Sequence, residues 1–212
     1  MLFRSGLGSL VAGLLSVGKS LLSLALPSLV MKGIGAAIMG FAKALGIGVD
    51  DDKDVEEIGD RALQAEEKGM TPDKFENNEA WLNEIEKDDW GYNPEKNKDL
   101  DPREKMAKGI DVSASLCAEK LPDDLRMGDF FNTVFKNNEL FSPESMTELG
   151  KMANNNIDDF RKVVDYVTGK TENFAEFREA RNLLAAVEKI ANPSLSDDDA
   201  WSRASEMFNL ER

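Results

Sequence analysis

Residues 7–27 read LGSLVAG LLSVGKS LLSLALP when the sequence is divided every seven residues. Each block begins with Leu and has Leu or Val at its fourth position, so apolar residues recur with the three-and-four spacing of one helix face. Small residues form stripes beside that face. The repeat therefore predicts a helix that packs through an apolar seam. The seam consists of Phe3, Leu7, Leu10, Leu14, Val17, Leu21 and Leu24, and the small-residue stripe of Ser9, Gly13, Ser16, Ser20 and Ser23.

The surroundings of the seam favour a helix bundle or a membrane over a soluble coiled coil. A soluble coiled coil carries Glu and Lys beside its seam, whereas the only charge inside this repeat is Lys19. Small residues allow helices to approach closely, as they do in membrane helix pairs. A helix over residues 3–26 would be roughly 36 Å long, enough to cross a hydrocarbon core of roughly 30 Å. Pro27 lacks an N–H, so we predict that it ends or kinks this helix and acts as a hinge.

A second helical segment follows over residues 28–48, SLVMKGIGAAIMGFAKALGIG. Its apolar residues recur at helical spacing and predict a second amphipathic face. This face consists of Ile34, Ile38, Phe41 and Leu45. Lys32 and Lys43 are about three helical turns apart and share another face. Together with Lys19 they are candidates to contact lipid headgroups or acidic partners.

Both segments resemble membrane-active helices. The LGSLVAG LLSVGKS LLSLALP repeat resembles the Leu/Ser heptad peptides that were designed to form serine-lined channels. The KGIGAA opening at residues 32–37 and the placement of the lysines resemble magainin- and melittin-type peptides. In style, these stretches resemble those of phage tape-measure and membrane-penetrating virion proteins, although no specific family is matched. The resemblance implies helices that bundle together, lie in a membrane interface or insert into it.

Charge divides the chain into two parts. The 212 residues have a formal charge of −14, but the first 49 residues hold four basic residues and no acid. All 40 acidic residues therefore follow residue 49. Such asymmetry predicts two domains: a hydrophobic Gly/Ser/Leu-rich helical segment at residues 1–49 and an acidic all-helical domain at residues 50–212. Because nucleic-acid affinity comes mainly from Lys and Arg on phosphates, the acidic domain is not expected to bind nucleic acid.

The acidic part is predicted to contain short helices separated by turn-forming residues. The expected helices run from Asp54 to Gly69, from Thr71 to about Asp88, from Asp101 onward, from Asp111 to Lys120, from Asp123 to Phe135, from Ser142 to Ala153, from Ile157 to Val167 and from Thr171 to Ala191. Ser196 with Asp199 is a capping box for a final helix. The predicted fold class is all-α, with an N-terminal hydrophobic helical hairpin or kinked helix followed by an acidic multi-helix domain.

The residue inventory argues against an enzyme. The chain has no His, the commonest general base and metal ligand. Its one Cys, Cys117, lies between Leu116 and Ala118 and is expected to be a buried apolar residue rather than a nucleophile. The acidic runs at residues 50–54 and 197–199 lack the spacing of a calcium loop. We therefore expect no catalytic residue, no metal site and no cofactor.

Three functions fit these features. The first is a structural, oligomeric component of a phage tail or related injection assembly, located in the virion or a comparable assembly, whose N-terminal helix bundles there and can enter a target membrane. Its partners would be further copies of the chain, neighbouring assembly proteins and a lipid bilayer. The second is a pore-forming toxin or bacteriocin-like protein, which should shelter its hydrophobic hairpin while free in solution. The third is a membrane-anchored helical adaptor, or a protein whose central hairpin is covered by Phe174, Phe177, Trp201 and Met207.

Overall fold

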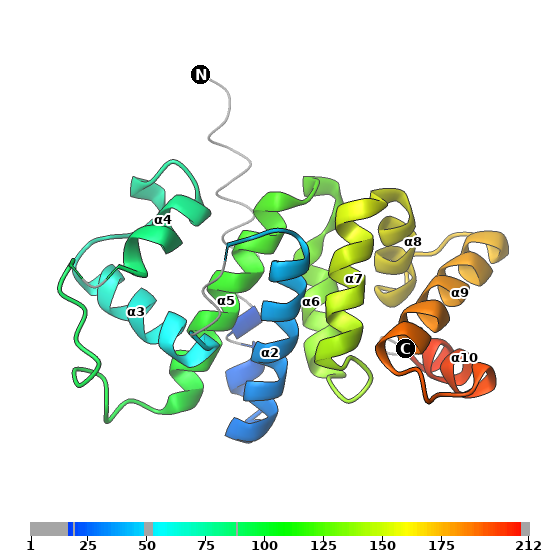
Figure 1. The fold of residues 1–212 in the computed structure, drawn as a ribbon, viewed down its shortest axis with the longest axis horizontal. Coiled ribbons are helices and arrows are strands. Elements are labelled where there is room, and N and C mark those ends of the chain that lie inside the picture. Colours follow the sequence, from blue (N-terminus) through cyan, green and yellow to red (C-terminus); the bar gives the residue numbers. More distant parts are fainter. Residues whose placement is uncertain (1–16, 19, 49–52, 88, 209–212) are drawn as a thin grey trace.

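The computed structural model describes residues 17–18, 20–48, 53–87 and 89–208, and within these ranges it contains helices and no strand. The predicted all-α fold is thereby confirmed. The helices are α2 (Ser28–Ala44), α3 (Val55–Glu67), α4 (Asn78–Ile85), α5 (Pro102–Lys120), α6 (Met127–Lys136), α7 (Pro143–Asn155), α8 (Ile157–Val167), α9 (Phe174–Ala191) and α10 (Asp197–Glu206), with short 3-10 turns at Pro72–Lys74 and Asp123–Leu125. Figure 1 shows α2, α5, α6 and α7 in the middle of the molecule, α3 and α4 at one end, and α9 and α10 at the other.

Helix α2 is the central element of the core, although it belongs to the hydrophobic N-terminal part of the chain. It packs mainly against α7 and α5. The fully buried ring of Phe41 meets the rings of Phe130, Phe131 and Phe160 at centroid distances of 6.3, 5.6 and 5.7 Å. Aromatic pairs at such distances contribute about 0.5–1.5 kcal/mol each beyond their buried area. The apolar face predicted for this segment therefore lies at the centre of the protein's own core.

Small residues allow these helices to approach closely. A Cβ atom added to Gly150 of α7 would lie 2.6 Å from the backbone oxygen of Phe41 in α2. At the crossing of α3 with α5, a Cβ atom added to Gly59 would lie 1.8 Å from the backbone oxygen of Lys105. Both distances are shorter than real Cβ atoms show against a backbone oxygen. Only glycine therefore fits at these two crossings without moving a helix.

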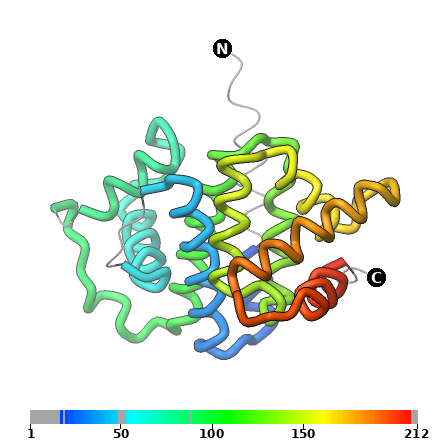
Figure 2. The backbone as a smooth tube through the Cα atoms, turned by 45° about the vertical axis from the view of Figure 1, so that its right-hand side comes forward, coloured from blue at the N-terminus to red at the C-terminus, as the bar shows by residue number. Residues whose placement is uncertain are grey.

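The described residues before α2 are also tied to the core. They are helical up to residue 23, and Val17 is fully buried. The N–H of Gly18 donates a hydrogen bond of 2.7 Å to Oδ1 of Asp111 in α5. The chain then turns and enters α2 directly after Pro27, as the blue segment in Figure 2 shows. Pro27 thus lies at the junction of two helical segments, where the sequence predicts a hinge.

Residues on both sides of the predicted boundary after residue 49 share one hydrophobic core. This core contains Ile38 and Ile47 from the N-terminal part, together with residues of every helix from α3 to α10. Among the described residues, no helix combines the length and the apolar character that crossing a bilayer requires.

Two of the helix boundaries predicted after residue 100 are wrong. The separate helix expected from Asp111 is part of one continuous helix, α5. Helix α5 continues through Gly109, where the missing Cβ allows the backbone oxygen of Val55 to approach. The helix expected from Asp123 is divided at Arg126, whose φ of +52° is left-handed and ends the 3-10 turn before α6.

Candidate functional site

The structure places three exposed leucines in one turn. Leu22, Leu24 and Leu29 are 40%, 45% and 81% exposed, and they lie between the end of the N-terminal helical residues and the first turn of α2. We call residues 22–29 the leucine turn. It contains no charged residue. Single exposed leucines are common on protein surfaces, whereas several in one short segment are typical of a contact surface.

Hydrogen bonds within the chain hold the leucine turn in place. The N–H of Leu24 donates to the carbonyl of Ser20 at 3.2 Å, and the hydroxyl of Ser23 donates to the same carbonyl at 2.7 Å. Ala25 has a φ of +50°, a left-handed conformation that is uncommon for residues other than glycine. The carbonyl of Pro27 then accepts two backbone hydrogen bonds from the first turn of α2. The leucines are thus presented by a turn with defined backbone geometry.

The structure divides the predicted seam between the core and the surface. Val17 and Leu21 are buried in the core, whereas Leu24 is exposed in the leucine turn. Of the small-residue stripe, Ser20 is half-buried and Ser23 is exposed. The remaining predicted members lie outside the described residues: Phe3, Leu7, Leu10 and Leu14 of the seam, and Ser9, Gly13 and Ser16 of the stripe.

The second predicted face is buried, and the lysines lie opposite to it. All four members of the face are at most 3% exposed: Ile34, Ile38, Phe41 and Leu45. Lys32 and Lys43 are both exposed, and Lys19 lies outside the described residues. Because Leu29 and Lys32 are three residues apart, they share one side of α2. The exposed side of α2 therefore carries a positive charge next to the leucine turn.

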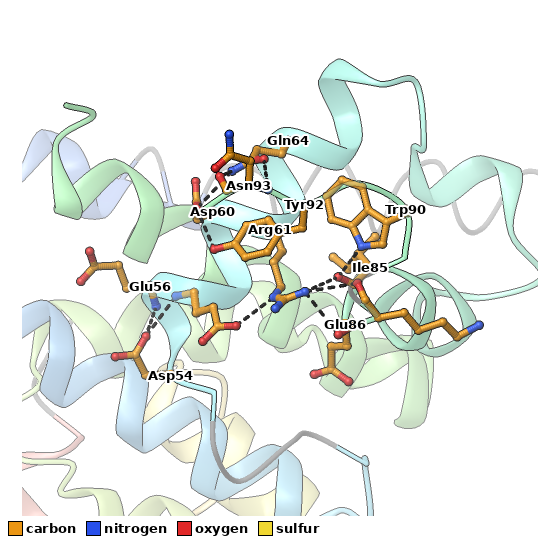
Figure 3. Close-up of polar contacts among 12 residues, drawn as sticks. Asp54, Glu56, Asp60, Arg61, Gln64, Ile85, Glu86, Trp90, Tyr92 and Asn93 are labelled. Atoms are coloured by element: carbon orange, nitrogen blue, oxygen red, sulfur yellow. Dashed lines mark hydrogen bonds and ion pairs between the residues drawn. The ribbon is translucent and has the colours of Figure 1, made fainter. Parts of the chain in front are cut away.

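A second candidate site is a polar cleft beside α3, which we call the α3 cleft. Its volume is about 620 Å³. Figure 3 shows the hydrogen bonds that hold its walls. The residues that line it come from α3, from the loop before α5 and from the first turn of α5. They are Asp54, Glu56, Glu57, Asp60, Arg61, Tyr92, Pro94 and Lys105.

Buried Asp60 is held in the cleft by uncharged donors. Its carboxylate accepts hydrogen bonds from the hydroxyl of Tyr92 at 2.9 Å, from the amide of Asn97 at 2.6 Å and from the amide of Gln64 at 3.2 Å. Burial and, after it, the hydrogen bond to Asp60 raise the pKa of Tyr92 well above its ordinary value. The hydroxyl of Tyr92 is therefore a fixed hydrogen-bond donor at neutral pH.

Arg61 holds the other side of the cleft. Its Nε donates to Glu57 at 2.9 Å, and its Nη1 donates to the backbone oxygens of residues 85, 86 and 87 at 3.2, 3.2 and 3.3 Å. Its guanidinium carbon lies 4.0 Å from the centre of the Tyr92 ring. A planar guanidinium group that is held by hydrogen bonds on several sides has little freedom to move. Arg61 thus joins α3 to the end of α4 and keeps the Tyr92 ring in place as a wall of the cleft.

Further features of the described residues concern the groups that could hold a metal ion or act as a nucleophile. Within the described part of the chain, no three acidic or thiol side chains converge in a way that could hold a metal ion. Cys117 is buried, as the sequence predicts, and burial raises the pKa of its thiol. A buried thiol of this kind is not a nucleophilic thiolate at neutral pH. The α3 cleft instead provides charges and hydrogen-bond donors at fixed positions.

The sequence gives little indication of the α3 cleft, because its partners are far apart along the chain. Asp60 and Tyr92 are separated by 32 residues, and Asp60 and Asn97 by 37. One local signal does exist. Glu57 and Arg61 have the spacing of paired side chains on one helix face, as do Asp60 and Gln64. That spacing identifies the polar face of α3 but not the residues that close over it.

Comparison with known proteins adds no assignment to either site. No family model, no curated protein and no solved structure matches the chain. The function is therefore inferred from the leucine turn and the α3 cleft themselves.

Proposed function

We propose that this protein is a structural component, without enzymatic activity, of a multi-subunit assembly of the phage-tail or injection type, and that it contacts its partners through the leucine turn. The partners are further copies of the chain, neighbouring assembly proteins and, on delivery, a lipid bilayer. In this proposal residues 1–49 form a hydrophobic helical hairpin hinged at Pro27, and the leucine turn is its exposed end. The acidic remainder of the chain contacts proteins rather than nucleic acid.

The exposure of the three leucines carries this proposal. Fully burying one such side chain against a partner is favourable by about 1.5–3 kcal/mol, and Leu29 alone is 81% exposed. Lys32 adds a positive charge beside the turn, which suits an acidic protein surface or anionic lipid. Because all 40 acidic residues follow residue 49, a second copy of the chain offers such an acidic surface.

A pore-forming toxin or bacteriocin-like protein is the second candidate, and one observation favours it. Helix α2 is enclosed by α3, α5 and α7, which is the sheltered state expected of a helix that is released at a membrane. In that function Ile34, Ile38 and Phe41 would leave the core and face lipid. A membrane-anchored helical adaptor, in contrast, would bind vesicles while α2 stays buried.

The experiment replaces the three exposed leucines of the leucine turn with Gln in the full chain. A matched control makes the same replacement at Phe174, Ile190 and Trp201. These residues are also large, apolar and exposed, but they belong to α9 and α10. Self-association is measured by sedimentation over a range of concentrations. Membrane binding is measured by flotation with neutral and with anionic vesicles.

We expect the intact chain to associate or to float, the leucine-turn variant to do neither, and the control variant to behave like the intact chain. An intact chain that stays monomeric and does not float overturns the proposal, and so does a leucine-turn variant that associates normally. Release of a trapped dye from vesicles, together with faster hydrogen exchange in α2, would instead favour the pore-forming function.

A further inference from the structure

Lys105 is a buried cation for which the described part of the chain supplies no hydrogen-bond or ion-pair partner. It lies in the first turn of α5, lines the α3 cleft and is only 9% exposed. No hydrogen bond and no ion pair within 4.0 Å joins its ammonium group to any described residue. Burying a charge without an opposite charge is unfavourable. An unpaired ammonium in the wall of a cleft therefore points to an anionic group that a ligand supplies.

The other charges of the cleft leave one carboxylate available. Asp54 accepts hydrogen bonds from two backbone N–H groups of α3 at 2.9 and 3.0 Å. Glu57 pairs with Arg61, and Asp60 accepts three hydrogen bonds from uncharged groups. The carboxylate of Glu56 makes no hydrogen bond or ion pair with a described residue. The cleft thus presents one ammonium and one carboxylate that do not neutralise each other.

We propose that the α3 cleft binds a small zwitterion of the amino-acid class, with the ligand's carboxylate on Lys105 and its ammonium group on Glu56. Tyr92 and Pro94 supply uncharged surface for the rest of the ligand. The ring of Tyr92 is already fixed by Asp60 and by the guanidinium of Arg61, so little ordering is needed on binding. A volume of about 620 Å³ lies within the range of small-molecule sites.

Other ligand classes fit this cleft less well. A simple anion would bind to Lys105 but would face four carboxylates in the lining, against two cations. A metal ion would be repelled by Lys105, and the described acidic side chains do not converge on one point. A ligand that carries both charges pairs with Lys105 and Glu56 at once and adds no net charge to the cleft. The site is separate from the leucine turn, so this proposal and the proposed function can fail independently.

The experiment presents the full chain with an equimolar mixture of the twenty free L-amino acids at neutral pH. Saturation-transfer NMR identifies those that bind, and titration calorimetry gives their dissociation constants. The variants are Lys105→Met, which keeps the aliphatic stem and removes the charge, and Glu56→Gln. Lys120→Met, an exposed lysine at the other end of α5, is the matched control.

We expect at least one amino acid to bind, with about tenfold weaker binding in each cleft variant, because a charge-assisted hydrogen bond is lost. Lys120→Met should bind like the unmodified chain. The carboxamide of the same amino acid lacks the carboxylate, so it should bind the unmodified chain and Lys105→Met with equal affinity. The N-acetyl derivative of the amino acid lacks the ammonium group, so it should bind the unmodified chain and Glu56→Gln with equal affinity.

Two results overturn the proposal: no amino acid in the mixture gives saturation transfer at millimolar concentration, or Lys105→Met and Glu56→Gln both bind as tightly as the control. Thermal unfolding of each variant verifies that it is folded. If Lys105→Met does not fold, Glu56→Gln decides, because the carboxylate of half-exposed Glu56 makes no hydrogen bond or ion pair with a described residue.

Discussion

The tight crossing of α3 over α5 predicts that Gly59→Ala is strongly destabilising. The new Cβ would lie 1.8 Å from the backbone oxygen of Lys105, whereas ordinary contact begins at 3.4 Å. The obstacle is helical backbone, which cannot rotate away as a side chain could. The two helices must therefore separate by roughly the missing 1.6 Å, the difference between those two distances.

Overpacking of a core typically costs about 1–3 kcal/mol and occasionally more, and a rigid backbone obstacle places Gly59→Ala at the upper end. Alanine is favoured over glycine in a helix by about 1 kcal/mol, which offsets part of this loss. The expected net change is a decrease of about 2 kcal/mol or more in the free energy of unfolding. Gly33→Ala in α2 is the matched control, because nothing lies within 4 Å of its added Cβ. It should raise the free energy of unfolding by up to about 1 kcal/mol.

Urea unfolding followed by far-ultraviolet circular dichroism measures both variants against the unmodified chain, and equal m-values verify that the same transition is compared. We expect the two glycine variants to change stability in opposite directions. If Gly59→Ala is as stable as Gly33→Ala, then α3 and α5 do not cross at the distance described, and the walls of the α3 cleft are misplaced as well.

Three further predictions concern buried or half-buried ionisable groups. Cys117 should not react with Ellman's reagent in the folded protein and should react fully in urea, because burial raises the pKa of its thiol and excludes the reagent. Burial also raises the pKa of Tyr166 to about 12 and raises that of Tyr92. An ultraviolet titration should therefore show little tyrosinate at about pH 11 while the chain is folded, and stability should fall as the pH rises above the ordinary tyrosine value of about 10. Burial raises the pKa of Asp165 too, so its protonated form favours folding, and this contribution is lost as the pH rises from about 3.9 through the folded pKa. Asp165→Asn should consequently raise the urea midpoint at pH 7 and leave it unchanged at pH 3.

Helix ends that depend on local hydrogen bonds could be predicted from the sequence. Ser142 and Ser196 cap α7 and α10 at the predicted positions, and α8 has the predicted bounds. Thr71 and Asn77 are both good capping residues. The sequence does not show which of the two starts the helix that was predicted from Thr71 to about Asp88. The structure has only a 3-10 turn after Thr71, and the side chain of Asn77 caps α4. The prediction of one helix from Thr71 is therefore wrong.

Burial was harder to predict, because it depends on which neighbours each face meets. Four residues were expected to cover a central hairpin. Met207 is buried and Phe177 is half-buried, but Phe174 and Trp201 are exposed. Helices α9 and α10 lie at one end of the molecule (Figure 1), so each packs against the rest of the core on one side only. Helical spacing identifies an apolar face but not how much of it a neighbour covers.

The same limit applies to the seam at the start of the chain. The heptad spacing places both Leu21 and Leu24 in the apolar seam, yet Leu21 is buried and Leu24 is exposed. The difference arises because the helix ends at residue 23 and the backbone turns at Ala25 with a φ of +50°. A repeat in the sequence cannot show where the backbone leaves the helix before the repeat has ended. The leucine turn could therefore be located only from the structure.

Quenching of a fluorophore in the leucine turn tests most directly whether this surface is where the protein meets its partners. Leu24→Cys can be labelled selectively, since the native thiol of Cys117 is buried and its pKa is raised. Glu172→Cys, at an exposed position before α9, is the matched control. Each labelled protein is titrated with acrylamide, alone at low concentration, then at high protein concentration, and with anionic vesicles.

The proposed function predicts that association or vesicle binding protects the label at residue 24 from acrylamide and leaves the label at residue 172 fully accessible. If the protein associates or binds vesicles while the label at residue 24 stays as accessible as in the dilute protein, the leucine turn is not the contact surface.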